Sequence, residues 1–204
     1  MTLFGKIGQR LGLGTPRAKL QTWEGNMFRY IPIVDGEWYH IVNRGNDRQT
    51  LFRTARDYEA FTIKFLSCLP KYKVEKIAYV LMPNHFHIVL VQHSGGSLPR
   101  FMKSVETSLA KRYNLLYSHQ GHVLGGPYRS VHIPSVQALL NIIRYVHLNP
   151  VRAGLVRHPS DWRYSDFNEL TAKGIRAHDP QDPIGEMPLS PESYSAHVCE
   201  MLRR

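Results

Sequence analysis

The sequence predicts an α+β fold of the ferredoxin-like, RRM-like split βαβ type, an antiparallel sheet with helices packed on one face. Three observations lead to this class. Segments with strand and helix periodicity follow one another in the order strand, helix, strand, strand, helix, strand, helix. The two central strands are separated by only two residues, which indicates a hairpin. No internal repeat is present, so one domain accounts for the whole pattern.

Four segments are predicted as strands because they are short, rich in β-branched and aromatic residues, and bounded by turn-forming residues. They are residues 36–44, 74–82, 85–92 and 128–133. Pro83-Asn84 separates the second strand from the third. We therefore expect these two strands to lie side by side.

Three helices are predicted between the strands. The first begins with a capping box made by Thr54 and Asp57 and ends at about Leu69, before a proline. The second follows Ser97, and the third opens at Ser135 and should end where Pro150 interrupts it. The second helix carries a stripe of apolar residues at helical spacing: Phe101, Met102, Val105, Leu109 and Tyr113.

The composition points to a polyanionic partner. The 204 residues carry a formal net charge of +10 and a pI near 9.8, which favours nucleic acid or an anionic surface. No membrane partner is expected, because no apolar stretch approaches the roughly 18 residues that a spanning helix needs. The two cysteines, Cys68 and Cys199, form no CxxC motif, and this pattern fits a cytoplasmic protein.

We predict three segments in the chain. Residues 1–27 form a basic N-terminal arm, with a mitochondrial-type presequence as the alternative, and residues 28–170 form the domain. Residues 171–204 form a C-terminal extension, in which 171–190 is a linker or flap and 191–203 a short helix.

The first candidate for chemistry is the pair His85 and His87. Residues i and i+2 of a strand project to the same face, so both imidazoles lie side by side and could chelate a divalent metal ion. The alternative is that a His-Phe-His strand is simply half exposed.

The second candidate is the pair Tyr145 and Asn149, which share one face of a helix because they are four residues apart. A phenol could supply a nucleophile and an amide a neutral oxygen ligand. The alternatives are core packing for Tyr145 and a helix cap before Pro150 for Asn149.

Together these pairs match one known family. The segment MPNHFHIVL resembles the His-hydrophobe-His motif of HUH single-tyrosine, IS200-like transposases. WYHIVNRGNDRQTLF, RYVHLNPVRAGLV and DWRYSDF are similar to the REP-associated tyrosine transposase branch, and the resemblance spans roughly residues 28–168. One segment departs from the family pattern GxLWQGRYKS: the chain has HVLGGPYRSVH, with Gly125 and Gly126 in place of an aromatic-polar pair.

The resemblance implies a metal-dependent single-strand DNA endonuclease and strand transferase with an HUH endonuclease core. It assigns metal ligation to His85 and His87, the nucleophile to Tyr145, and the place of a polar third ligand to Asn149. Tyr145 would form a 5′-phosphotyrosine and free a 3′-hydroxyl, so that DNA is cleaved and rejoined without ATP. Imidazole and oxygen ligands with an open position suit Mg²⁺ or Mn²⁺. Arg144 is a basic neighbour that could ease ionisation of the phenol.

The partner implied by the resemblance is single-stranded DNA with a stem-loop, and the protein is expected as a monomer or homodimer. Basic residues near the predicted site elements are candidates for phosphate contacts. They are Arg44, Arg48, Arg53, Arg100, Lys103, Lys111, Arg112 and Arg129.

Other hypotheses keep part of this pattern. A replication initiator or relaxase shares the histidine pair and the tyrosine, but the short chain lacks room for a helicase. A non-catalytic RRM-like module would bind nucleic acid on an exposed sheet, but no RNP-like aromatic string such as GFGFVxF is present. A zinc hydrolase would need a third strong ligand and would leave no protein–DNA adduct.

Overall fold

A computed structural model describes residues 32–173, 175–179 and 182–189. The sheet and its helices belong to the unit Ile33–Arg204. The predicted basic arm at 1–27 and the predicted helix at 191–203 lie outside the described residues. Among the residues that are described, no helix is long and apolar enough to cross a membrane.

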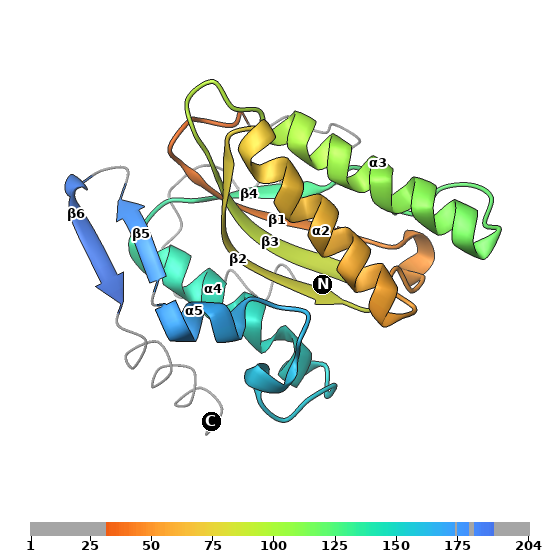
Figure 1. The fold of residues 1–204 in the computed structure, drawn as a ribbon. Helices are drawn as coiled ribbons and strands as arrows, with labels where there is room; N and C mark the ends of the chain where they lie inside the picture. The colour runs from red at the N-terminus through yellow and green to blue at the C-terminus, as the bar shows by residue number, and fades with distance from the viewer. Residues whose placement is uncertain (1–31, 174, 180–181, 190–204) are drawn as a thin grey trace, which may run out of the picture. The chain divides into compact units, whose positions relative to one another are not determined.

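The centre of the fold is a four-stranded sheet (Figure 1). Its strands are β1 (Trp38–Arg44), β2 (Val74–Met82), β3 (His85–Gln92) and β4 (Arg129–Ile133), in the spatial order β2-β3-β1-β4. All three pairings are antiparallel. This order and direction are those of a ferredoxin-like sheet, so the predicted α+β class and the predicted hairpin are confirmed.

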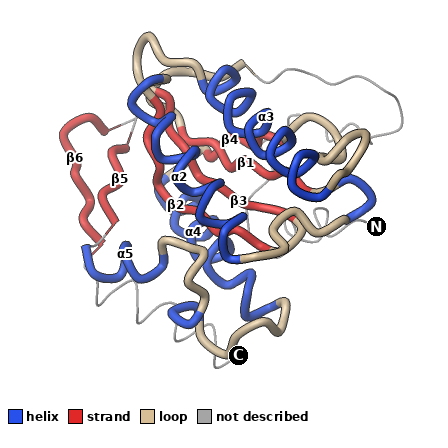
Figure 2. The backbone as a smooth tube through the Cα atoms, turned by 45° about the vertical axis from the view of Figure 1, so that its right-hand side comes forward, coloured by secondary structure: helices blue, strands red, loops and turns tan. Residues whose placement is uncertain are grey.

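Helices α2 (Ala55–Lys71) and α3 (Leu98–Tyr117) lie side by side on one face of the sheet (Figure 2). Both begin as their sequences predict: the Asp57 carboxylate accepts the backbone N–H of Thr54 at 2.9 Å, and the Ser97 hydroxyl accepts that of Arg100. Alternate residues of β1 and β3, such as Ile41 and Ile88, point into the core under these two helices.

Helix α4 (Val136–Arg152) covers the opposite face, where it packs on β2 and β3. The prediction that helices pack on one face therefore holds for α2 and α3 but is wrong for α4. The physical reason is that β1, β2 and β3 are buried on both faces, and a sheet with two apolar faces needs a covering layer on each. Because α4 covers this face of β2 and β3, these strands do not present the open sheet surface that RRM modules use to bind RNA.

Two helices run further than the sequence predicts. Pro70 lies inside the last turn of α2, and Pro150 lies inside α4, which continues to Arg152. A proline at position 150 cannot donate to the Val146 carbonyl four residues earlier. The side-chain amide of Asn149 donates to that carbonyl at 3.3 Å instead, so the helix continues without leaving the acceptor unpaired.

The chain then returns to the free edge of β2. Leu81 N–H donates to the carbonyl of Tyr164 at 2.9 Å, and the indole N–H of Trp162 donates to Leu81 O at 3.0 Å. Helix α5 (Phe167–Lys173) follows. A hairpin of β5 (Ile175–Asp179) and β6 (Asp182–Leu189) occupies the segment for which the sequence predicts a linker.

Candidate active site

The two histidines of β3 project from the sheet toward α4, because alternate residues of a strand share a face. The rings of His85 and His87 are 5.1 Å apart, centroid to centroid. His87 is buried and His85 is half-buried. Burial lowers the pKa of His85 to about 4, assisted by the charge of Arg44, and it lowers the pKa of His87 well below 6.5. Both rings are therefore neutral near pH 7 and can offer a lone pair.

A third histidine, which sequence analysis did not single out, completes the cluster. His40 lies on β1 and is 4% exposed, and its Nε2 is 3.1 Å from the Nδ1 of His87. The two rings stack with centroids 5.2 Å apart and an interplanar angle of 18°. The register explains the contact: His87 pairs with Val42, so His40 is its diagonal neighbour two residues along β1. Burial lowers the pKa of His40 to about 4.

Tyr145 projects from α4 onto this histidine cluster. Its ring meets that of His87 edge-on, with centroids 5.5 Å apart, and the ring of His40 at 6.2 Å. Helix α4 packs on the sheet of its own chain, so one chain brings the phenol and the imidazoles together. The predicted convergence of the strand histidines and the helix tyrosine is present in this geometry.

A second residue missed by sequence analysis acts on the phenol. The guanidinium carbon of Arg152 is 5.3 Å from the centroid of the Tyr145 ring. Burial raises the pKa of Tyr145, whereas the charge of Arg152 and a hydrogen bond with the Asn149 side chain lower it. Residues seven apart are almost two helical turns apart and share one face, so the spacing of Tyr145 and Arg152 could have placed them together from the sequence. The expected end of the helix at Pro150 concealed it. Arg144 instead donates to the Asn141 side chain at 3.1 Å.

Asn149 supports the helix backbone in this structure. Its Nδ2 donates to the carbonyl of Tyr145 at 2.7 Å and to that of Val146 at 3.3 Å. Asn149 lies inside the helix, which continues to Arg152, so it is not the expected cap before Pro150. Because the amide nitrogen is used in these bonds, Oδ1 is the Asn149 atom with a lone pair to offer a cation.

A buried polar network fixes α4 against β2 beside the site. His147 Nε2 lies 2.9 Å from Asp166 Oδ1, and Lys76 Nζ lies 2.6 Å from Asp166 Oδ2. The backbone N–H of Tyr79 also donates to this carboxylate. His147 and Asp166 are both fully buried. The hydrogen bonds to His147 and Lys76 hold the pKa of Asp166 below its ordinary value although burial opposes them, so the network carries an ionised carboxylate.

The predicted phosphate-contacting residues divide between the two faces of the sheet. Arg44 pairs with His85, and Arg129 pairs with Val42, so both start on the face that carries the histidines. Arg48 is exposed in the turn after β1, with a positive φ of 61°.

Arg100, Lys103 and Lys111 are exposed on α3, across the sheet from the histidines.

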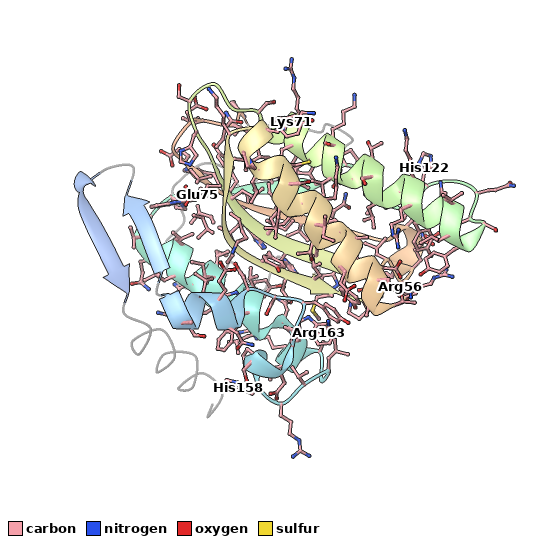
Figure 3. The ribbon with its side chains drawn as sticks, viewed as in Figure 1. Arg56, Lys71, Glu75, His122, His158 and Arg163 are labelled. Carbon is pink, nitrogen blue, oxygen red and sulfur yellow. The ribbon has the colours of Figure 1, made fainter. Side chains whose placement is uncertain are left out.

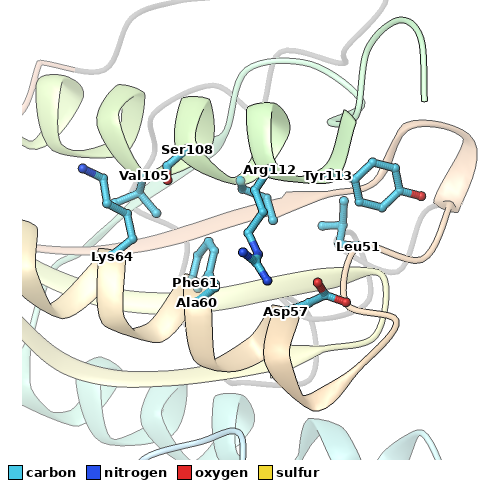
Figure 4. A pocket seen from close by; sticks show the side chains of 10 residues that line it. Leu51, Asp57, Ala60, Phe61, Lys64, Val105, Ser108, Arg112 and Tyr113 are labelled. Atoms are coloured by element: carbon cyan, nitrogen blue, oxygen red, sulfur yellow. The ribbon is translucent and has the colours of Figure 1, made fainter. Parts of the chain in front are cut away.

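Two of the predicted residues are engaged in packing α2 and the segment before it on α3. Arg53 donates to the hydroxyl of Tyr113 at 2.6 Å and lies over the Tyr117 ring at 4.2 Å. Arg112 is half-buried and points from α3 toward α2 and Asp57, into a cavity of about 20 Å³ (Figure 4). Its Nε has no hydrogen-bond partner within the described part of the chain. This cavity lies on the far side of the sheet from the histidine cluster.

The loop that departs from the family pattern reaches the end of β1. Gly125 N–H donates to Arg44 O at 2.9 Å, and Asn43 Nδ2 donates both to Gly126 O and to a carboxylate oxygen of Glu106. Gly126 has a φ of 145°, which side-chain-bearing residues rarely adopt. The backbone conformation of Gly126 thus lets this loop close against the strand that carries His40.

The side chains of the site could provide some, but not all, of the ligands of a divalent metal ion. Within the described residues, no group of three or more His, Cys, Asp or Glu side chains is arranged to hold a metal ion. His85 and His87 nevertheless provide two neutral imidazoles, and both use Nδ1 for hydrogen bonds to neighbours. The Nε2 atom of each ring makes no hydrogen bond to any described residue, and it is the atom suited to ligation.

Comparison with known proteins identifies the family of this chain. The family model described as "Transposase IS200 like" matches residues 34–149, and the chain belongs to this family of transposases. The REP-associated tyrosine transposase of Escherichia coli K12 is 24% identical over 154 residues, covering 72% of this chain and 86% of the relative. A solved structure of a REP-associated tyrosine transposase bound to a REP hairpin has the same fold, with a TM-score of 0.61 and 19% identity over 74% of this chain and 88% of that one.

Proposed function

We propose that this transposase cleaves and rejoins single-stranded DNA beside a stem-loop, with Tyr145 as the nucleophile. The observation that carries the proposal is the contact of the Tyr145 ring with His87, next to a second neutral imidazole. The similarity to a protein whose solved structure holds a REP hairpin supports a stem-loop substrate.

In the proposed reaction, the Tyr145 oxygen attacks the scissile phosphorus in line with the bond to the 3′ oxygen. The phenol loses its proton as the 5′-phosphotyrosine bond forms, the P–O3′ bond breaks, and the leaving strand takes up a proton as a 3′-hydroxyl. A 3′-hydroxyl attacking the phosphotyrosine reverses the step and releases the phenol. The phosphodiester energy is conserved in the protein–DNA bond, so rejoining needs no nucleotide cofactor.

His85 and His87 would hold Mg²⁺ or Mn²⁺ through their Nε2 atoms, with Asn149 Oδ1 as a third donor. When bound, this ion would offset negative charge on the scissile phosphate. The Arg152 guanidinium would favour the ionised phenol, because it lowers the pKa of Tyr145 against the effect of burial. Arg44 and Arg129 would contact the phosphates nearest the site, since they begin on the histidine face.

The test is detection of a covalent adduct on a denaturing gel, with a labelled hairpin oligonucleotide that carries a single-stranded flank. Wild-type protein should form the adduct with Mn²⁺ or Mg²⁺ and not with a chelator. Tyr145→Phe should form none while still binding the oligonucleotide. The matched control is Tyr164→Phe, which keeps the ring that stacks on Tyr58 at 3.6 Å and should keep the adduct. An adduct formed by Tyr145→Phe would refute the assignment.

A further inference from the structure

The buried contact between His40 and His87 is not accounted for by the proposed roles of the site residues. The two nitrogens, His40 Nε2 and His87 Nδ1, are 3.1 Å apart, and both residues are under 5% exposed. A hydrogen bond between two imidazoles needs one ring to donate and the other to accept, so the contact couples the tautomers of the two rings.

The proton can lie on either side, and the two arrangements have different consequences. If His87 donates from Nδ1, its Nε2 carries a lone pair and can bind a cation. If His40 donates from Nε2, the neutral His87 ring carries its proton on Nε2 and cannot bind a cation there. The tautomer of His40 therefore decides whether His87 offers a ligand atom toward the side of His85 and Tyr145.

His85 also has a hydrogen-bond partner at Nδ1, and here the direction of the hydrogen bond is determined. Its Nδ1 is 2.7 Å from Asn84 Oδ1, and Asn84 Nδ2 donates to the carbonyl of Arg48 at 3.2 Å. That second bond fixes the orientation of the amide, so the atom facing His85 is an acceptor. His85 must then donate from Nδ1, which leaves the lone pair on Nε2. Each strand histidine thus has a neighbour at Nδ1, Asn84 for His85 and His40 for His87.

We propose that His40 is a positioning residue: its Nε2 accepts the Nδ1 proton of His87, which fixes the His87 ring with Nε2 presented as a metal ligand. This inference rests on the proposed metal-binding role of His87. The antiparallel register of β1 and β3 holds the two rings stacked at 5.2 Å. Neighbours of this kind orient a ligand and raise its basicity without touching the metal, and their loss commonly weakens metal affinity by about 10- to 100-fold.

The first measurement is Mn²⁺ affinity of the full chain without DNA, from the free-ion signal in electron paramagnetic resonance. His40→Leu removes the acceptor, and we expect Mn²⁺ binding to weaken by about 10- to 100-fold. His40→Gln keeps an acceptor oxygen on a side chain of similar reach and should bind Mn²⁺ more tightly than His40→Leu. The control is His122→Leu, which removes an exposed imidazole in the loop that follows α3 (Figure 3) and should bind as wild type does.

The second measurement is the nitrogen NMR spectrum of the histidine side chains in the metal-free wild-type chain, which identifies the protonated nitrogen of each ring. We expect His87 to be protonated on Nδ1. This readout needs no variant, so it decides the question even if His40→Leu does not fold. A His87 protonated on Nε2, or a folded His40→Leu that binds Mn²⁺ as tightly as wild type, would overturn the proposal.

The outcomes separate this proposal from the one on which it rests. If the wild-type chain binds no Mn²⁺ and His85→Ala changes nothing, the metal-binding role of the strand histidines has failed. If wild type binds Mn²⁺ and His85→Ala abolishes it, but His40→Leu has no effect, only the positioning role has failed. Direct spin coupling between bound ¹¹³Cd²⁺ and a His40 nitrogen would also reject positioning, because His40 would then be a ligand.

Discussion

The phenol ring of Tyr145 stands edge-on to the imidazole of His87, with ring centroids 5.5 Å apart and an interplanar angle of 88°. One residue comes from a helix and the other from a central strand of the same chain. The contact depends on how α4 docks on the sheet and on which charges surround the phenol.

Removal of the Arg152 guanidinium should slow attack by Tyr145. The charge 5.3 Å from the ring lowers the pKa of Tyr145, so Arg152→Gln raises that pKa and reduces the ionised fraction at neutral pH. Adduct formation by Arg152→Gln at neutral pH should therefore be slower than in wild type, because attack needs the ionised phenol.

The measurement is single-turnover adduct formation between pH 6 and 10, and the rate profile of Arg152→Gln should move to higher pH. Arg144→Gln is the matched control, because Arg144 is adjacent in sequence but donates to Asn141. A profile that moves with Arg144→Gln and not with Arg152→Gln would contradict the assignment.

The network around Asp166 should stabilise the docking of α4. Asp166→Asn would remove the charge that pairs with Lys76, whose side chain is only 14% exposed, and would disturb the bond to His147. Breaking a buried ion pair from one side costs about 3–5 kcal/mol in the free energy of unfolding. Urea titration measures this cost, and adduct formation should fall with it because the tyrosine helix loses an anchor.

Glu59→Gln is the control for this experiment. Glu59 pairs with Arg163 at 3.4 Å, but their side chains are 54% and 68% exposed, and such pairs contribute about 0–1 kcal/mol. Equal destabilisation by the two variants would show that the buried network has no special role.

Much of this arrangement follows from local sequence, and the remainder depends on tertiary register. Strands 74–82 and 85–92 have the predicted bounds, because Pro83-Asn84 is the turn that divides one apolar run into two strands. The placement of His85 and His87 on the same face of one strand follows from strand periodicity alone. His40 could not be found this way, since a single histidine in a buried strand becomes informative only when β1 and β3 are aligned. The position of α4 was missed because burial of both sheet faces is a property of the assembled strands.

The buried carboxyl group of Glu106 should make stability depend on pH. Burial raises its pKa from 4.5 to about 7, although a hydrogen bond from Asn43 opposes this. The folded protein therefore keeps a proton on Glu106 between about pH 4.5 and 7, where the unfolded chain has released it. By linkage, the contribution of this group to the free energy of unfolding falls as pH rises through that window, by about 3 kcal/mol in total.

Glu106→Gln mimics the protonated carboxyl group and cannot ionise, so it should gain stability relative to wild type as pH rises from 5 to 8. Urea titrations at several pH values measure the difference. Glu75→Gln serves as the control, since Glu75 is 57% exposed and bonded to an exposed histidine. A constant difference between wild type and Glu106→Gln over this range would show that Glu106 is already ionised in the folded state.

DNA contacts should be concentrated on the histidine face of the sheet. Arg44 pairs with His85 at the end of β1, whereas Lys103 is exposed on α3 across the sheet. Each phosphate contact contributes about 0.7–0.9 to the slope of log affinity against log salt. Arg44→Gln should therefore weaken binding of a hairpin oligonucleotide and reduce this slope by that amount, while Lys103→Gln should leave the slope nearly unchanged. Fluorescence anisotropy at a series of KCl concentrations, in a Tyr145→Phe background without metal, isolates binding from cleavage. If Lys103→Gln reduces the slope and Arg44→Gln does not, the stem-loop lies over α3 and the charged residues of that helix form the DNA-binding surface instead.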